Sequence, residues 1–169
     1  MDQLRVRERD DAPSRSLSGI HGHGGFPLHT DFAHYAIPPR YVLLRNACTV
    51  PIRPTIVQTL DALSCPETAQ RTLQRRVWVI RGGPVPFYAP VLFGAGAYVR
   101  WDAACMSPSA LATDALHTWT ECLAFAKPFR FEWDINTVLV IDNWRTLHGR
   151  AGDTMASDAN RVLERIVVS

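Results

Sequence analysis

Three residues that can bind a metal ion lie far apart in this chain, and together they constrain its fold more than any other feature. His29 and Asp31 lie near the start, and His148 lies near the end. Two histidines and one carboxylate can occupy one face of an Fe(II) ion and leave the other face open for a chelating cosubstrate and dioxygen. On a β-strand, residues two positions apart point to the same face, so His29 and Asp31 could bind one metal. Alone the pattern is weak, because a His-x-Asp triplet arises by chance in many chains.

The segment that follows His148 makes the metal interpretation stronger. Residues 160–168 read as a terminal strand in which Arg161, Leu163, Arg165 and Val167 share one face. The two arginines would be about 13 Å apart at their backbones and could serve two anionic groups in one cavity. Arginine suits this role because its planar fork binds carboxylates with two hydrogen bonds and keeps its charge. The alternative is a solvated edge strand with surface arginines.

With these motifs the chain resembles the Fe(II)/2-oxoglutarate-dependent oxygenases of the taurine dioxygenase and clavaminate synthase-like superfamily. The resemblance covers most of the chain from Phe26 onward, and residues 65–97 contribute least to it. The order and spacing of the motifs carry it, and they lie at residues 26–35, 38–45, 54–63, 98–102, 138–150, 161 and 165.

The resemblance implies a role for each metal and cosubstrate residue. His29, Asp31 and His148 would bind Fe(II). Thr55 would donate a hydrogen bond to the distal carboxylate of 2-oxoglutarate, and Arg161 would form a salt bridge with the same carboxylate. The presence of a carboxylate at position 31 favours hydroxylation, desaturation or another oxidation over halogenation, because halogenating relatives carry a small residue there.

The resemblance also suggests how a substrate would bind. Arg165 matches a position that meets an anionic group of the primary substrate in several relatives. Arg100 and Asp102 match an Arg-x-Asp found in the branch that acts on amino acids. Asp102 would meet a substrate amine if it faces the cavity, and a purely structural role is the alternative.

The implied activity is that of a dioxygenase with Fe(II), 2-oxoglutarate and dioxygen as cofactor and cosubstrates. It would oxidise, chiefly hydroxylate, an unactivated C–H bond of a small amino acid or amino-acid-derived metabolite in specialised metabolism, releasing succinate and CO2. Two alternatives come from other classes. One is a degenerate, non-catalytic jelly roll that acts as a binding or scaffold protein, and the other is a cupin-like metalloenzyme that works without 2-oxoglutarate.

Composition narrows the class of protein further. The chain has 169 residues, of which 47% are hydrophobic, as in one globular domain. A net charge of +2 gives no reason to expect nucleic acid or an anionic membrane as partner. No membrane span or secretory signal is evident, and the four cysteines lack paired spacing, so we expect a cytoplasmic protein with reduced thiols. A small-molecule substrate is the expected partner, and a homo-oligomer stays open.

We predict a mainly β fold with flanking helices, a double-stranded β-helix (jelly roll) shortened at the N-terminus. Residues 1–25 would form a mobile N-terminal arm or loop, and residues 26–169 a single oxygenase-like jelly-roll domain. The predicted strands are 40–48, 76–80 and 97–102, with a hairpin-like pair at 129–133 and 137–141. The other predicted elements are a short helical segment at 55–63, a helix from a capping box at 64–67 to residue 74, a loop at 81–96 and a helix at 107–126.

Overall fold

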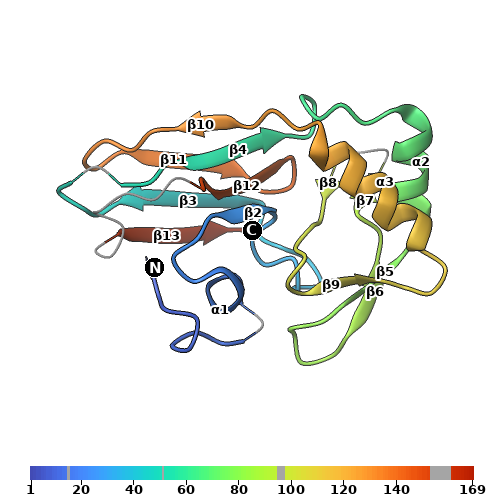
Figure 1. The fold of residues 1–169 in the computed structure, drawn as a ribbon, viewed down its shortest axis with the longest axis horizontal. Coiled ribbons are helices and arrows are strands. Elements are labelled where there is room, and N and C mark those ends of the chain that lie inside the picture. Colours follow the sequence, from blue (N-terminus) through green and yellow to red (C-terminus); the bar gives the residue numbers. More distant parts are fainter. Residues whose placement is uncertain (15, 51, 95–97, 153–160) are drawn as a thin grey trace.

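A computed structural model describes residues 1–14, 16–50, 52–94, 98–152 and 161–169. Two four-stranded antiparallel sheets make up one half of the molecule (Figure 1). The first sheet has the order β1 (Asp2–Arg5), β13 (Val162–Val168), β3 (Tyr41–Asn46) and β11 (Val138–Asp142). The second has the order β10 (Phe129–Phe131), β4 (Thr55–Thr59), β12 (Thr146–Arg150) and β2 (Phe26–His29). This arrangement confirms the predicted jelly roll.

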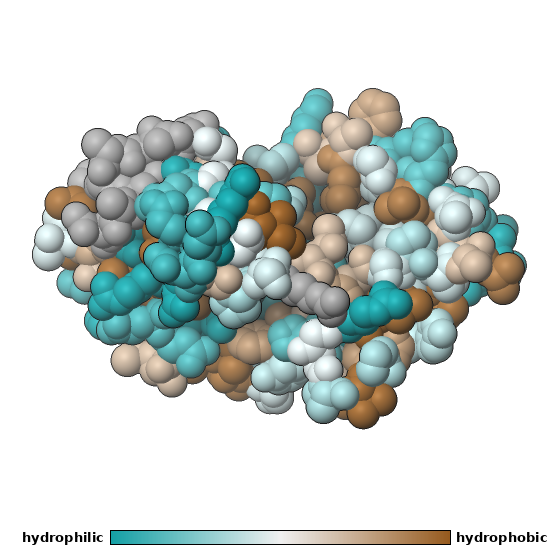
Figure 2. Space-filling model, turned by 60° about the horizontal axis from the view of Figure 1, so that its bottom comes forward, coloured by the Kyte–Doolittle hydropathy of each residue, from teal (hydrophilic) through white to brown (hydrophobic). Residues whose placement is uncertain are grey.

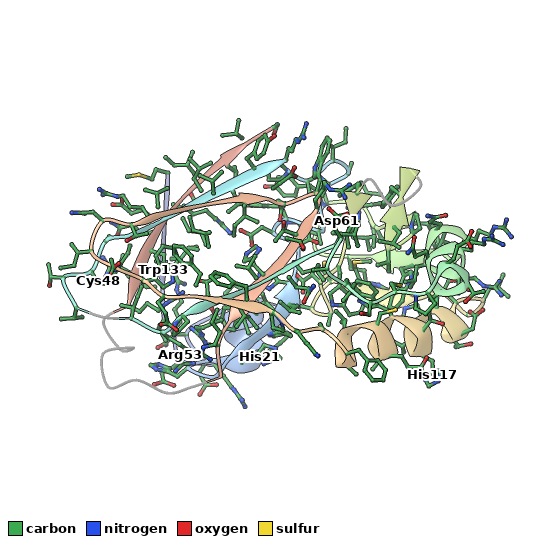
Figure 3. The ribbon with its side chains drawn as sticks, turned by 90° about the horizontal axis from the view of Figure 1, so that it is seen from above. His21, Cys48, Arg53, Asp61, His117 and Trp133 are labelled. Atoms are coloured by element: carbon green, nitrogen blue, oxygen red, sulfur yellow. The ribbon has the colours of Figure 1, made fainter. Side chains whose placement is uncertain are left out.

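Alternating side chains of the first sheet form the core of the jelly roll. The buried side chains are Val42 and Leu44 of β3, Ile141 of β11 and Leu163 of β13. Their neighbours along each strand are more exposed. Trp133, which follows β10, joins the same cluster, and Figure 3 shows it among the strands. The core follows from the period-two alternation of these strands.

The second half of the molecule lies between β4 and β10 in the sequence and carries the flanking helices (Figure 1). Its core contains Trp78, Trp101 and Trp119, whose rings meet edge to face with centroids 5.2 and 5.6 Å apart. Its elements are α2 (Glu67–Arg75), β5 (Trp78–Ile80), β6 (Phe87–Ala89), β7 (Leu92–Phe93), β8 (Tyr98–Val99), β9 (Met106–Pro108) and α3 (Thr113–Ala124). No helix in the described ranges is long and apolar enough to cross a membrane.

Several local predictions differ from the structure. Residues 55–63, predicted to be helical, begin with strand β4, and the expected loop at 81–96 contains β6 and β7. The second predicted helix begins later, at Thr113, because residues 106–108 pair with β5 as β9. The capping box at the start of α2 is also wrong, since Pro66 occupies the N-cap without a side-chain hydrogen bond.

The predicted hairpin is wrong for a topological reason. Residues 129–131 form β10 and residues 138–142 form β11, but β10 pairs with β4 and β11 pairs with β3. The two segments are therefore successive strands that belong to different sheets of the jelly roll.

The N-terminal segment has more regular structure than an arm or loop. Within residues 1–25, β1 pairs with β13, and Leu17–His21 form the short helix α1, capped by Ser16. The helix α1 lies beneath the two sheets in Figure 1. The predicted mobility of the segment and the domain boundary at residue 26 stay predictions.

Candidate metal centre

Two of the three candidate ligands meet through the pairing of two adjacent strands. His29 ends β2, and His148 lies in the middle of β12, directly opposite it in the antiparallel register. Their ring centroids are 4.6 Å apart, and both residues are buried. Because opposite residues of an antiparallel pair project to the same face, both imidazoles point into the same cavity.

The third candidate joins them from just beyond the strand. Asp31 lies past the end of β2, which corrects the idea that it shares a strand with His29. Its Oδ1 is 3.6 Å from Nε2 of His29 and 3.7 Å from Nε2 of His148. One ligand atom from each residue lies within 4.8 Å of the other two. A divalent ion held about 2 Å from each donor fits this spacing, and the donor set is the one that suits non-heme Fe(II).

Hydrogen bonding prepares the imidazole of His29 for a metal. Its Nδ1 lies 2.9 Å from the carbonyl oxygen of Pro27, which can only accept a hydrogen bond. Nδ1 therefore carries the proton, and Nε2 is directed toward Asp31 and His148 as the ligand atom. A carbonyl partner of this kind fixes the ring orientation in many metal sites.

The electrostatics of the site favour an ionised Asp31 and a neutral His148, and they favour the protonated form of His29. Burial alone would raise the pKa of Asp31, but the nearby His29, the charges of His148 and His29, and Arg165 lower it far below its ordinary value. Burial lowers the pKa of His148 to about 4, and the charge of His29 adds to this effect. Burial would also lower the pKa of His29, yet the contact with Asp31 raises it overall. Because a metal needs the neutral imidazole of His29, metal binding would compete with the protonation that Asp31 favours.

Arg165 contacts the metal-site carboxylate directly. Its Nη1 donates to Oδ2 of Asp31 at 3.0 Å, its Nη2 donates to Oδ2 of Asp2 at 3.2 Å, and its guanidinium lies over the ring of Phe32. The ion pair leaves Oδ1 as the oxygen of Asp31 that faces the two histidines. The predicted contact of Arg165 with substrate stays a prediction.

The two residues predicted to hold 2-oxoglutarate line the same cavity. Thr55 begins β4 and is 2% exposed, and Arg161, just before β13, is 8% exposed. Nε1 of Trp133 donates to Oγ1 of Thr55 at 3.1 Å. Since the indole can only donate, the hydroxyl accepts here and its own hydrogen stays available for another acceptor. Trp133 is a residue that sequence reasoning did not connect with the site.

The two residues of the Arg-x-Asp pair have different surroundings. Asp102 lines the cavity and accepts a hydrogen bond from the amide of Ala104 at 2.8 Å. Arg100 is buried, does not line the cavity and donates to main-chain carbonyls of residues 33, 35 and 36. Arg100 therefore shapes the loop that follows Asp31.

The cavity that contains these residues has a volume of about 820 Å³. Ligand pockets of a few hundred to about a thousand cubic ångströms accept small molecules. Residues of the N-terminal segment line the cavity, as do residues of β9 and of the turn before it. In Figure 2 the bottom of the molecule as drawn in Figure 1 is turned forward. Hydrophilic residues gather there on the half of the molecule that holds the sheets.

No family model and no curated protein matches this sequence. Solved structures do match, among them the non-heme iron oxygenase OrfP in complex with Fe and alpha-ketoglutaric acid. This match has a TM-score of 0.74 and 23% sequence identity, and it covers 99% of this chain and 56% of OrfP. The chain has the fold of a non-heme iron oxygenase. Asparagine oxygenase in complex with Fe(II), 3-hydroxyasparagine and succinate matches with a TM-score of 0.70 and 21% identity over 92% of this chain and 53% of that enzyme.

A second OrfP structure holds Fe, succinate and (3S)-hydroxy-L-Arg, and matches with a TM-score of 0.69 and 24% identity over 84% of this chain and 48% of OrfP. The chain thus spans about half the length of the solved structures it matches.

Proposed function

We propose that this chain is an Fe(II)- and 2-oxoglutarate-dependent oxygenase. The observation that carries the proposal is the convergence of His29, Asp31 and His148 in one cavity with Thr55 and Arg161. When bound, iron, 2-oxoglutarate and dioxygen would supply the oxidation of a substrate C–H bond, with release of succinate and CO2.

The protein would contribute binding, orientation and the exclusion of water. Arg161 and Thr55 would hold the distal carboxylate of 2-oxoglutarate, with the Thr55 hydroxyl kept as a donor by Trp133. Arg165 would keep Oδ2 of Asp31 engaged, so that the carboxylate would offer Oδ1 to the metal. The buried strands would fix a chosen C–H bond close to the metal.

We further propose a small amino acid, or a metabolite derived from one, as the substrate. OrfP and asparagine oxygenase, which share the fold, are solved with hydroxyarginine and hydroxyasparagine. Asp102 lines the cavity and could meet the substrate amine, and Arg165 could share its guanidinium with a substrate carboxylate. A cytoplasmic location and a homo-oligomer remain predictions from the sequence.

The test is an anaerobic titration of the metal-free protein with Fe(II) and 2-oxoglutarate, which follows the weak visible charge-transfer band of the chelate. We expect the band in the wild type, its loss in His148→Ala and a weaker band at equal 2-oxoglutarate in Arg161→Ala. His117→Ala is the matched control, since His117 lies on the outer side of α3, far from the sheets (Figure 3).

The alternatives give different results in the same titration. Metal binding without a 2-oxoglutarate band would favour a metalloenzyme that works without this cosubstrate. Well-folded protein that binds neither ligand would refute the proposal and favour a non-catalytic binding or scaffold protein.

A further inference from the structure

Asn143, in the tight turn between β11 and β12, holds the backbone of the metal-site carboxylate residue. Its side chain is fully buried. Oδ1 accepts a hydrogen bond from the amide of Asp31 at 2.9 Å, and Nδ2 donates to the carbonyl oxygen of Asp31 at 3.0 Å. The second Nδ2 hydrogen goes to the carbonyl of Pro39 at 2.9 Å. The amide therefore holds the peptide groups on both sides of the Asp31 Cα, and both of its hydrogens are used.

The backbone at Asp31 needs such support because regular structure ends before it. β2 ends at His29, so no sheet ladder holds the peptide of Asp31. The next residue, Phe32, has φ 56°, a left-handed conformation that non-glycine residues adopt at a cost of roughly 1 kcal/mol or more. A strained conformation of this kind persists only where neighbouring groups determine it.

Other side chains hold the rest of the loop but do not bind the main chain of Asp31. Arg100 donates to the carbonyls of Ala33, Tyr35 and Ala36. Nε1 of Trp144 donates to the carbonyl of Pro38 at 3.0 Å. Among the described residues, Asn143 is the side chain that pairs with the main chain of Asp31.

We infer that Asn143 is a positioning residue for the metal ligand Asp31. It does not line the cavity and acts through the backbone. Asn143 begins the short turn that leads into β12, the strand that carries His148, so its side chain joins the segments of two ligands. The separation of Asp31 from His148 is thus set by one amide as well as by the sheet register.

A matched pair of alanine variants tests this role without requiring turnover. Asn46 of β3 is also fully buried, donates to the carbonyl of Asp134 at 3.0 Å and accepts from the amide of Cys48 at 2.9 Å. Asn143→Ala and Asn46→Ala remove the same group from the same kind of environment. We expect both to lower the unfolding temperature and Asn143→Ala alone to weaken Co(II) binding, by tenfold or more, and to change the visible spectrum of bound Co(II).

Asn143→Ser, which keeps a short hydrogen-bonding group, decides the question if the alanine variant does not fold. A folded Asn143 variant with wild-type Co(II) affinity and spectrum would overturn the inference. Equal weakening in Asn46→Ala would overturn it too, because the effect would then follow from lost stability. Wild-type protein that binds no Co(II) would refute the metal site and this role together, whereas failure to bind 2-oxoglutarate would leave the role of Asn143 standing.

A second observation, the charge of the cavity lining, bears on the substrate. The whole chain is nearly balanced, with 18 basic and 16 acidic residues. Among the residues that the structure describes, the lining has two carboxylates, Asp31 and Asp102. The described arginines of the lining are Arg5, Arg7, Arg81, Arg150, Arg161 and Arg165.

Three of these arginines are already assigned. Arg150 donates to the carbonyls of Gly22 and Gly24, Arg165 pairs with two carboxylates, and Arg161 has the proposed role with 2-oxoglutarate. The other three are exposed. Of these, Arg5 donates to Gln3 at 3.0 Å and Arg81 donates to the hydroxyl of Ser107 at 2.6 Å, both neutral partners. No ion pair to Arg5, Arg7 or Arg81 is seen within the described residues.

From this excess of positive charge we infer that the substrate carries an anionic group in addition to its α-carboxylate, an inference that rests on the proposed function. Arg5, Arg7 and Arg81 would meet that group where the cavity opens to solvent. These guanidinium groups would attract an anionic group, would gain little from an amide and would repel a second guanidinium, so an acidic amino acid fits better than a neutral or basic one.

Isosteric amino acids test the inference. The probes are L-aspartate against L-asparagine and L-glutamate against L-glutamine, added to the Fe(II) and 2-oxoglutarate complex while the chelate band and succinate release are followed. We expect at least a tenfold lower half-saturating concentration for the acidic member of a pair. Arg81→Gln should reduce that preference, and Arg71→Gln, on the exposed face of α2, should not.

Equal or stronger responses to the amides, or no response to any of the four probes, would overturn the anionic substrate class. Absence of the chelate band before any probe is added would instead refute the proposed oxygenase function, so the two failures are distinguishable.

Discussion

The buried imidazole of His148 predicts a loss of stability at acid pH in the metal-free protein. Burial lowers its pKa in the folded state from 6.5 to about 4. Between these two values the unfolded chain binds a proton that the folded protein excludes, so stability present above pH 6.5 is lost as the pH falls toward 4. At 1.36 kcal/mol for each unit, the loss is about 3 kcal/mol, with about 2 kcal/mol of it gone by pH 5.

The assay is urea unfolding of wild type and His148→Gln at several pH values from 7 to 4, with a chelator present to exclude metal. Glutamine stays neutral throughout, and other groups such as His29 titrate in both proteins, so the difference between the two curves reports His148. We expect the wild type to lose about 3 kcal/mol more than the variant over this range. Parallel curves would refute the claim that the folded protein keeps this imidazole neutral.

Three further variants test the contacts around the metal. Trp133→Phe should weaken 2-oxoglutarate binding about fivefold, since about 1 kcal/mol is typical for one hydrogen bond, and an unchanged chelate titration would show that the indole does not orient Thr55. Gly149→Ala would place a Cβ against main-chain carbonyl oxygens of β2 and should lower both the unfolding temperature and Co(II) affinity. Arg165→Gln removes the arginine from its ion pair with the partly buried Asp31 and should lower the stability of the metal-free protein by roughly 2 kcal/mol. Bound metal should reduce that loss, and an equal loss with and without Co(II) would contradict the reasoning.

Features that depend on local alternation could be predicted from the sequence. The expected terminal strand appears as β13, with Arg161 and Leu163 buried on the face assigned to them. The side chains of a strand alternate whatever its partners are, so the faces can be assigned without knowing the pairing. The buried stripe of the long helix, with Ala115 and Trp119 inside, follows from helical periodicity in the same way.

Pairing between strands could not be predicted in this way. β10 and β11 are close in sequence and separated by a short turn, which suggested a hairpin, yet each joins a different sheet. The choice depends on where β3 and β4 lie, and no local pattern contains that information. The error at β4 has another cause, since its β-branched residues Thr55, Ile56, Val57 and Thr59 favoured a strand over the predicted helix.

In the candidate site too, the features that depend on residue type could be predicted, and those that depend on long-range contacts could not. The three ligand positions came from residue type and order, and the structure brings them together. The supporting groups were missed because they act across the fold: Asn143 reaches Asp31 from 112 residues away, and Trp133 reaches Thr55 from 78 residues away. Asn143 lies within a segment that drew attention for its histidine, but nothing local indicates that a buried amide will bind another segment's backbone.

Sheet register explains why this site is sensitive to changes that lie outside the cavity. His29 and His148 face each other across β2 and β12, and a slip of one residue would turn one ring to the opposite face of the sheet. Immediately after His148 the register shifts, and Gly149 allows β2 to approach closely at that point. Asp31 has no such register to place it, so its position depends on side-chain hydrogen bonds to its backbone. Strand pairing therefore places the two histidines, and a loop places the carboxylate. Because that loop is not part of either sheet, substitutions in it, or in the turn that contacts it, should alter metal binding while leaving the jelly roll intact.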